Sequence, residues 1–234
     1  MFVDVKVLDE GQAPRRLALN RSQLRRLTLR EPSAIAIHRR PTAGRRAVEG
    51  FLEEAYAVAF GGRVAAHYPV LMSLHDAAGG ILAAAGFRLA ATGPLFLEQY
   101  LDRPIEALMR DAPPRAAIAE IGNLASGGSG ASVVLIAAIA DQLRREGCSH
   151  AAVTATAQLR RGFSWLGFDY DQLAAADPSR LADGGASWGR YYEADPRVIA
   201  GSLDVAASLP GRLIAAPAGP MFGVCGPAGV ECAA

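Results

Sequence analysis

Apolar and polar positions along this chain follow the periods of both helices and strands. An amphipathic helix is predicted over Arg45–Phe60, where apolar side chains recur at helical spacing and three glutamates fall largely on the opposite face. Gly61 and Gly62 follow the last periodic residue and are expected to end this helix. Apolar runs at Tyr68–His75 and Ile81–Ala91, joined through a glycine-containing turn, predict a β-hairpin.

The rest of the pattern predicts a mixed order of strands and helices. Further strands are expected at Phe2–Val7 (or a frayed end), Ala34–Arg40, Ile118–Leu124, Ala151–Thr156, Ser187–Glu193 and Val198–Val205. Further helices are expected at Ser22–Arg30, Leu95–Arg110 with a break at Pro104, Val133–Glu146 and Gln158–Leu166. We therefore divide the chain into a basic N-terminal segment (1–44), one α/β domain (45–206) and a tail rich in Pro, Gly and Ala (207–234) that is expected to be disordered.

The most informative segment is the turn Ser126–Ser132, which holds three glycines and three serines between a strand and a helix. Such a turn predicts an anion site, because backbone amides and the positive end of the helix both point at the ligand. The segment has no Walker A lysine, and its glycines lack the GxGxxG order of a dinucleotide site. A βαβ unit with a plain flexible turn remains an alternative.

The order of elements, this turn and a helix that ends in Gly167-Phe168 together resemble the GNAT acyltransferase fold. The resemblance implies an α/β (α+β mixed) architecture: a central mixed, mostly antiparallel sheet, flanked by helices and splayed between the strands at 118–124 and 151–156. It also implies acyl-CoA or the phosphopantetheine of an acyl-carrier protein as donor. The residues that would hold this carrier are Leu124, Ser126, Gly127, Gly128, Ser129, Gly130, Ala131 and Ser132.

Five phrases of the sequence resemble a narrower family, the thermostable haemolysins of bacteria. They are LFLEQYLDRPIE (95–106), AEIGNLAS (119–126), TATAQLRRGFSWLGF (154–168), LAAADPSRL (173–181) and WGRYYEADPRVIAG (188–201). The family name implies a membrane-lytic toxin. However, the sequence shows no export signal, pore-forming hairpin or membrane-spanning helix, so a cytoplasmic GNAT-like enzyme is expected.

The layout is also similar to the acyl-homoserine-lactone synthases, whose corresponding strand carries a glutamate followed three positions later by an arginine. Here Glu120 matches and Asn123 departs from that pattern. Glu120 is a candidate general base, which typically contributes about 10²–10⁴ in rate, and Asn123 joins it as a catalytic candidate. The alternative for Glu120 is a structural carboxylate that holds a neighbouring loop.

Other positions also depart from the GNAT pattern. The usual Arg or Gln at the head of the turn is missing, and Phe163 stands where a tyrosine often protonates the leaving thiolate. Tyr191, or alternatively Tyr192, is the candidate replacement for this acid. Replacing Gly130 with valine is expected to block the carrier site and leave the fold intact.

Candidate acceptor-binding residues are Glu98, Tyr100, Arg88, Trp188 and Tyr192. Glu98 lies four residues before Asp102, a spacing that brings two acids together on a helix and suits an amine ligand. Solvated helix charges and plain core packing of Trp188 are the alternatives.

Charge is balanced overall but concentrated locally. The net charge of +1 argues against nucleic-acid binding, whereas the segment 14–46 holds ten arginines and one acid, Glu31. Within it Arg15, Arg16, Arg25, Arg26, Arg39 and Arg40 are candidates to dock an acidic acyl-carrier protein. A solvated face or a peripheral contact with an anionic membrane are the alternatives. The three cysteines form no metal spacing, and no metal is expected.

Together these observations predict an N-acyltransferase that moves an acyl group, expected to be fatty, to a small amine or amino acid. The other hypothesis is a non-catalytic protein on the same fold, either membrane-active or acyl-binding. The missing arginine or glutamine and the missing tyrosine leave that hypothesis open.

Overall fold

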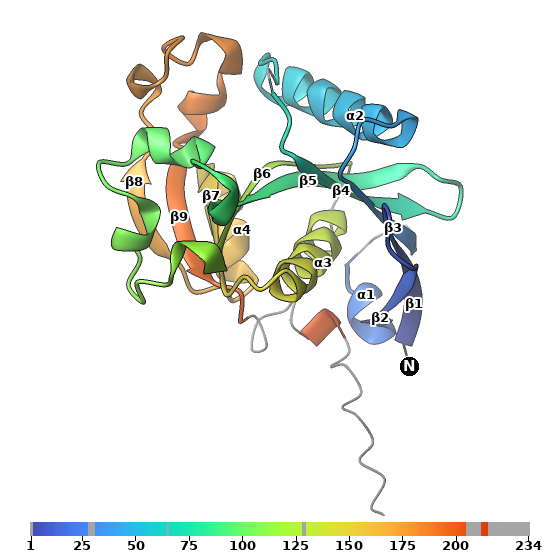
Figure 1. Cartoon of the computed structure of the whole chain (residues 1–234). Helices are drawn as coiled ribbons and strands as arrows, with labels where there is room; N and C mark the ends of the chain where they lie inside the picture. Colours follow the sequence, from blue (N-terminus) through green and yellow to red (C-terminus); the bar gives the residue numbers. More distant parts are fainter. Residues whose placement is uncertain (1, 28–30, 65, 128–129, 205–211, 215–234) are drawn as a thin grey trace, which may run out of the picture.

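The centre of the structure is a nine-stranded mixed sheet with the order β2-β1-β3-β4-β5-β6-β7-β9-β8 (Figure 1). The computed structural model describes residues 2–27, 31–64, 66–127, 130–204 and 212–214. The strands are β1 (Phe2–Asp9), β2 (Arg15–Asn20), β3 (Pro32–His38), β4 (Val70–Asp76), β5 (Ile81–Leu89), β6 (Ile118–Ser126), β7 (His150–Ala155), β8 (Asp171–Ala175) and β9 (Arg197–Ser202). Neighbouring strands run antiparallel except for the pairs β1–β3 and β6–β7, which confirms the predicted mixed, mostly antiparallel sheet.

Two long helices pack on the middle of this sheet. They are α2 (Ala43–Phe60) and α3 (Ala131–Arg145), and each contacts β4, β5 and β6. Figure 1 shows α2 above the sheet and α3 below it. The shorter helices are α1 (Arg21–Leu24) and α4 (Ala157–Trp165), of which α4 packs on β7. The sheet is thus covered on both faces at the level of β4–β6.

The predicted apolar faces of both long helices form the core. Val48 and Leu52 of α2 are fully buried against Leu71 and Ala84 of the sheet. On the other side α3 joins a large cluster that includes Met72, Leu74 and Phe87. The apolar stripes that the helical period predicts are therefore the buried faces of α2 and α3, because each stripe faces the sheet.

The N-terminal residues belong to the same sheet. The strands β1, β2 and β3 lie within the segment 1–44, and β3 pairs directly with β4. The guanidinium of Arg15 donates to Asp141 at 3.0 Å and to Gln142 at 2.9 Å, both on α3. Strands on both sides of residue 44 therefore belong to one sheet. Most of the tail lies outside the described residues.

Two predicted elements are wrong. Leu95–Arg110 forms 3-10 turns at Phe96–Tyr100 and Ile105–Ala107, because Glu98 binds the backbone amides of Leu95 (2.9 Å) and Ile105 (3.3 Å) and interrupts a helix.

The predicted late strand Ser187–Glu193 also forms 3-10 turns. Gly189 lies there with φ at 56°, and a Cβ at this position would sit 2.8 Å from the backbone carbon of Gly61. The close approach of the α2 end thus sets this conformation. Two strands were missed by sequence reasoning, namely β2 and the edge strand β8.

Candidate active site

The candidate site lies where β6 and β7 part. Their parallel pairing joins Ile118–Ile121 to His150–Val153 and ends there, although both strands continue. On its other side β6 has one residue more than β5 between the pairs Gly86–Gly122 and Ala84–Ala125. This bulge holds Asn123 at φ 52°, a left-handed conformation that asparagine tolerates better than most residues.

A cleft of about 310 Å³ opens at this gap. Five of the predicted site residues line it: Asn123, Leu124, Ser126, Ser132 and Tyr191. Its remaining walls are Tyr56, Phe60, Gly122, Val153, Thr154, Thr156, Gln158, Leu159 and Gly162, contributed by α2, β6, β7 and α4 with its N-cap. The structure therefore brings part of the predicted carrier site and two of the predicted catalytic residues to one place.

A second, apolar pocket of about 80 Å³ begins at the same gap. Leu124 and Val153 line both spaces, so the cleft and the pocket meet between the two strands. The pocket continues between the sheet and the helices along Ile121, Ile136, Ile139, Ala140, Phe163 and Phe168. Phe163 packs edge-on against Phe168, with ring centroids 5.4 Å apart.

The glycine-rich turn is only partly open to a ligand. The amide of Gly127 donates to the carbonyl of Leu82 at 3.0 Å and so continues the sheet pairing. Ala131 is buried in the core at the start of α3, while Gly128 and Ser129 lie outside the described residues. A cleft ligand would therefore meet Ser126 and Ser132 rather than every residue of the turn.

The surroundings of Gly130 contradict the effect expected for valine at this position. Its φ is 91°, and a Cβ there would lie 2.8 Å from Cβ and 2.9 Å from the carbonyl oxygen of Leu27. Valine at this position would therefore strain the backbone and displace the N-terminal segment. The expectation that Gly130→Val leaves the fold intact is wrong.

Glu120 is buried behind the cleft and holds a loop. Its side chain is 1% exposed, and its two oxygens accept the amides of Phe96 (2.8 Å) and Leu97 (2.9 Å). Burial raises the pKa of Glu120, while these amides, a hydrogen bond from the Tyr68 hydroxyl and the charge of Arg88 oppose the rise. The structural alternative for this carboxylate is thus realised, and any catalytic role requires a group that reaches it.

Arg88 lies against this carboxylate rather than in the cleft. Its Nε is 3.7 Å from Oε2 of Glu120, and its guanidinium lies 5.1 Å from the centre of the Tyr68 ring. Arg88 also donates to the carbonyl of Pro94 at 3.3 Å. It therefore belongs to the wall around Glu120.

Aromatic side chains form the other wall. The hydroxyl of Tyr191 donates to the carbonyl of Thr154 at 3.1 Å, and burial raises the pKa of Tyr191 well above its usual range. Trp188 lies 5.3 Å from the Tyr191 ring. A small side pocket of about 30 Å³ joins this wall to the cleft, and its lining includes Tyr56, Tyr68, Phe96, Tyr100 and Trp188. Tyr56 and Tyr68 were missed by sequence reasoning.

Three of the predicted acceptor residues are hydrogen-bonded to other side chains. Tyr192 shares a 2.7 Å hydrogen bond with the hydroxyl of Tyr100. Both carboxylate oxygens of Glu98 accept from Arg115, at 2.7 and 2.8 Å, and this ion pair lowers the pKa of Glu98 to about 2. Asp102 pairs with Arg180 at 2.6 Å instead of joining Glu98. The carboxylate pair inferred from helical spacing is absent, because these residues are not on one helix.

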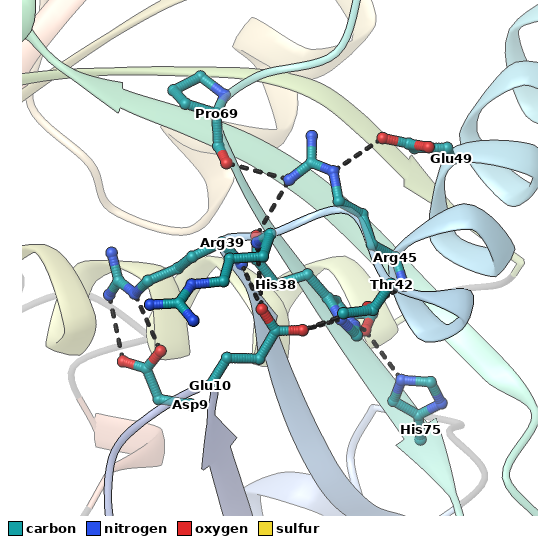
Figure 2. A network of polar contacts seen from close by, with 11 residues as sticks. Asp9, Glu10, His38, Arg39, Thr42, Arg45, Glu49, Pro69 and His75 are labelled. Carbon is teal, nitrogen blue, oxygen red and sulfur yellow. Dashed lines mark hydrogen bonds and ion pairs between the residues drawn. The ribbon is translucent and has the colours of Figure 1, made fainter.

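The predicted arginine patch is divided by ion pairs. Arg39 binds Asp9 (2.9 Å) and Glu146 (2.6 Å), as part of the network around β1 and β3 in Figure 2. Arg16 pairs with Asp4 at 3.2 Å. The side chains of Arg25, Arg26 and Arg40 are exposed, while Arg15 and Arg39 are half-buried and bound to acids. The six arginines thus do not form one uniform surface.

Across the described ranges, no helix is long and apolar enough to cross a membrane. In the same part of the chain, no three His, Cys, Asp or Glu side chains come together in a way that could hold a metal ion.

Comparison with protein families decides the relationship of this chain. The sequence profile described as "Thermostable hemolysin" matches residues 38–207, which is most of the chain. The chain belongs to the thermostable haemolysin family. No curated protein matches its sequence well enough to count as a relative.

Solved structures resemble this family member in fold. The apo form of TofI has a TM-score of 0.53 and 19% identity, and the match covers 75% of this chain and 95% of TofI. TofI in a ternary complex with an inhibitor and MTA gives 0.51 and 17%, with the same coverage. LasI, an AHL (acyl-homoserine lactone) synthase, gives 0.50 and 15%, covering 74% of this chain and 92% of LasI. The haemolysin family member thus has a GNAT-like fold, a large mixed sheet flanked by helices.

Proposed function

We propose that this protein is an acyltransferase that moves a fatty acyl group from acyl-CoA or acyl-carrier protein to a small amine or amino acid. The observation that carries the proposal is the cleft at the parting of β6 and β7, which continues into an apolar pocket. A thioester carrier would lie in the cleft with its acyl chain between the strands. The acceptor would approach from the aromatic wall.

The apolar pocket supports a fatty acyl group over an acetyl group. Its lining residues between Leu124 and Phe168 are mostly aliphatic or aromatic, so each buried CH₂ of a chain would contribute about 0.8 kcal/mol. Phe163 lines this pocket, whereas a tyrosine hydroxyl there would need a partner. The phenylalanine that departs from the GNAT pattern is therefore suited to binding the chain.

The chemistry requires an amine nitrogen to attack the thioester carbonyl, after which the carbon–sulfur bond breaks. The amine loses one proton and the leaving thiolate gains one. Asn123 lines the cleft, and among the described residues its Nδ2 has no hydrogen-bond partner, so it would donate to the developing oxyanion. The hydroxyl of Tyr191, which donates to the carbonyl of Thr154, would turn toward the leaving thiolate and give it a proton.

Gly162 offers a matched test of this site. It lines the cleft from α4, and a Cβ at this position would meet no atom within 4 Å. Gly162→Leu is expected to fill the cleft and abolish thioester binding, while Gly162→Ala should fold at least as well and leave room for the ligand. Calorimetry with acyl-CoA and acyl-carrier protein, from two to fourteen carbons, measures both variants.

The outcomes separate the two functional hypotheses. Loss of binding in Gly162→Leu alone supports the site, whereas equal affinity in both variants contradicts it. Thioester binding without transfer to any amine would favour the acyl-binding alternative. Binding that is equally strong for acetyl and longer chains would contradict a fatty donor.

A further inference from the structure

We propose that Tyr68 is a catalytic residue whose hydroxyl carries the proton of the acceptor amine to Glu120. This inference rests on the proposed acyl transfer and names a group in its proton path. The amine nitrogen would give its proton to the Tyr68 oxygen as the hydroxyl proton of Tyr68 passes to the Glu120 carboxylate. Tyr68 ends unchanged, Glu120 gains one proton, and the nitrogen keeps its new bond to the acyl carbon.

Glu120 is shielded from the cleft. Its side chain is 1% exposed, and both of its oxygens already accept backbone amides from the loop at Phe96 and Leu97. An amine in the cleft therefore has no direct path to the carboxylate. A buried acid can still act as a base when a hydrogen-bonded hydroxyl connects it to the substrate.

Tyr68 lies between the Glu120 carboxylate and the cleft. Its hydroxyl lies against Gly122, which follows Glu120 by two residues and therefore shares its face of β6, and Arg88 contacts both the Tyr68 ring and the Glu120 carboxylate. Interaction with Tyr68 lowers the pKa of Glu120, against the larger effect of burial. Tyr68 also lines the small side pocket, whose lining includes Gly122, Asn123, Thr154 and Tyr191. These four residues line the main cleft as well, whereas Tyr68 does not. The tyrosine thus contacts the buried acid on one side and the space for the acceptor on the other.

Two glycines make room for the Tyr68 ring on the sheet. A Cβ at Gly86 would lie 2.9 Å from ring carbons of Tyr68, and a Cβ at Gly122 would lie 2.6 Å from its Cε2 and Cζ. These residues face each other in the β5–β6 pairing, directly before the bulge at Asn123. Any larger residue at either position would displace the hydroxyl.

Hydrogen bonds from Arg45 hold the backbone at Tyr68 in place. Arg45 is buried at the start of α2 and donates to the carbonyls of Tyr68 (2.7 Å) and Pro69 (3.0 Å). Its Nε binds Glu49 at 2.8 Å, so the guanidinium is held on both sides (Figure 2). Arg88 covers the ring face. A relay needs such a fixed position, because proton transfer is sensitive to the distance between donor and acceptor.

Tyr68→Phe tests the relay, since it removes the oxygen and keeps the ring. We expect kcat for acyl transfer to fall about 100-fold or more, with unchanged thioester affinity in calorimetry. The rise of kcat with pH that follows ionisation of Glu120 should also disappear. The control is Ser73→Ala, which removes a buried hydroxyl on β4 that shares a 2.8 Å hydrogen bond with His75 and lines neither the cleft nor the side pocket. It should retain kcat within about threefold.

A titration of Glu120 by carboxyl-carbon NMR supplies a readout that does not depend on turnover. Loss of the Tyr68 hydroxyl should raise the pKa of Glu120 in Tyr68→Phe and leave it unchanged in Ser73→Ala. Wild-type kcat and pH profile in a folded Tyr68→Phe protein would overturn the relay and leave the acyltransferase proposal standing. A wild-type protein that binds and transfers no thioester would overturn the proposed function, and the relay with it.

Discussion

Asn123 shows at the scale of one residue how backbone shape and chemistry meet in this site. The extra residue in β6 requires a left-handed conformation at this position, and the side chain lines the cleft with its Nδ2 unpartnered within the described part of the chain. An apolar residue would satisfy neither condition, because a Cβ-bearing residue without a local hydrogen-bonding group is strained at φ 52°.

Two substitutions separate the effect of the left-handed backbone at Asn123 from the effect of its carboxamide. Asn123→Gly should keep the free energy of unfolding close to wild type, while Asn123→Ala should lose about 1 kcal/mol from left-handed strain. Both remove the carboxamide, so both should lower kcat by about 10²–10³ if this group binds the oxyanion. Urea unfolding and steady-state kinetics measure the two effects. Wild-type kcat in the glycine variant would rule out the oxyanion role.

The residues of the site could be predicted in part from the sequence. A carboxylate within an apolar strand and a family-like phrase single out Glu120, Asn123 and Tyr191; of these, Asn123 and Tyr191 line the cleft and Glu120 is buried behind it. Tyr68 carried no local signal, since its position depends on Gly86 and Gly122 meeting across the β5–β6 pair. That pairing is a long-range property, and no period or motif in the chain reports it.

At the scale of elements, the long helices and the hairpin were predictable, whereas the connections near the site were not. The helix α2 has an apolar stripe, a Thr42 cap and Gly61 at its end, so local signals agree with its burial. The segment 95–110 has similar composition but turns twice, because Arg115, twenty residues away from its start, fixes Glu98. Tertiary ion pairs of this kind override helical propensity.

The Glu98–Arg115 pair predicts a specific dependence of stability on pH. The pKa of Glu98 falls from 4.5 to about 2 on folding, so its contribution to stability is present above pH 4.5 and is lost as the pH falls toward 2. Glu98→Gln should therefore be less stable than wild type at pH 7, with a difference that shrinks below pH 4.5. Thermal unfolding from pH 2 to pH 7 measures this, and a constant difference would contradict the assignment.

At the scale of the whole molecule, ion pairs join the N-terminal strands to the rest of the sheet. Arg39 at the end of β3 links Asp9 of β1 with Glu146 beside α3, and side-chain hydrogen bonds to these acids raise its pKa further above its usual value. Arg15 makes a similar link to α3. Much of the local basic charge is therefore matched by acids that lie far away in the sequence, which composition could not reveal.

Arg39 and Arg40 form a natural comparison. Arg39→Ala removes the cation from the buried carboxylate of Asp9 and from the half-buried one of Glu146, which keeps a hydrogen bond from Gln142, and should lower the free energy of unfolding by about 2–4 kcal/mol. Arg40→Ala removes an exposed side chain and should change it by less than about 0.5 kcal/mol. Urea unfolding of both variants checks this, and equal losses would show that the network does not bind the N-terminal strands to the sheet.

The most direct test of the acyltransferase account is a transfer assay in which thiol release and amide formation are followed together. The protein is incubated with fatty acyl-CoA or acyl-carrier protein and a mixture of amines and amino acids, and products are identified by mass spectrometry. The account predicts amine-dependent thiol release with one new amide per thiol, retained in Gly162→Ala and lost in Gly162→Leu. A wild-type protein that neither binds a thioester nor forms an amide would contradict it.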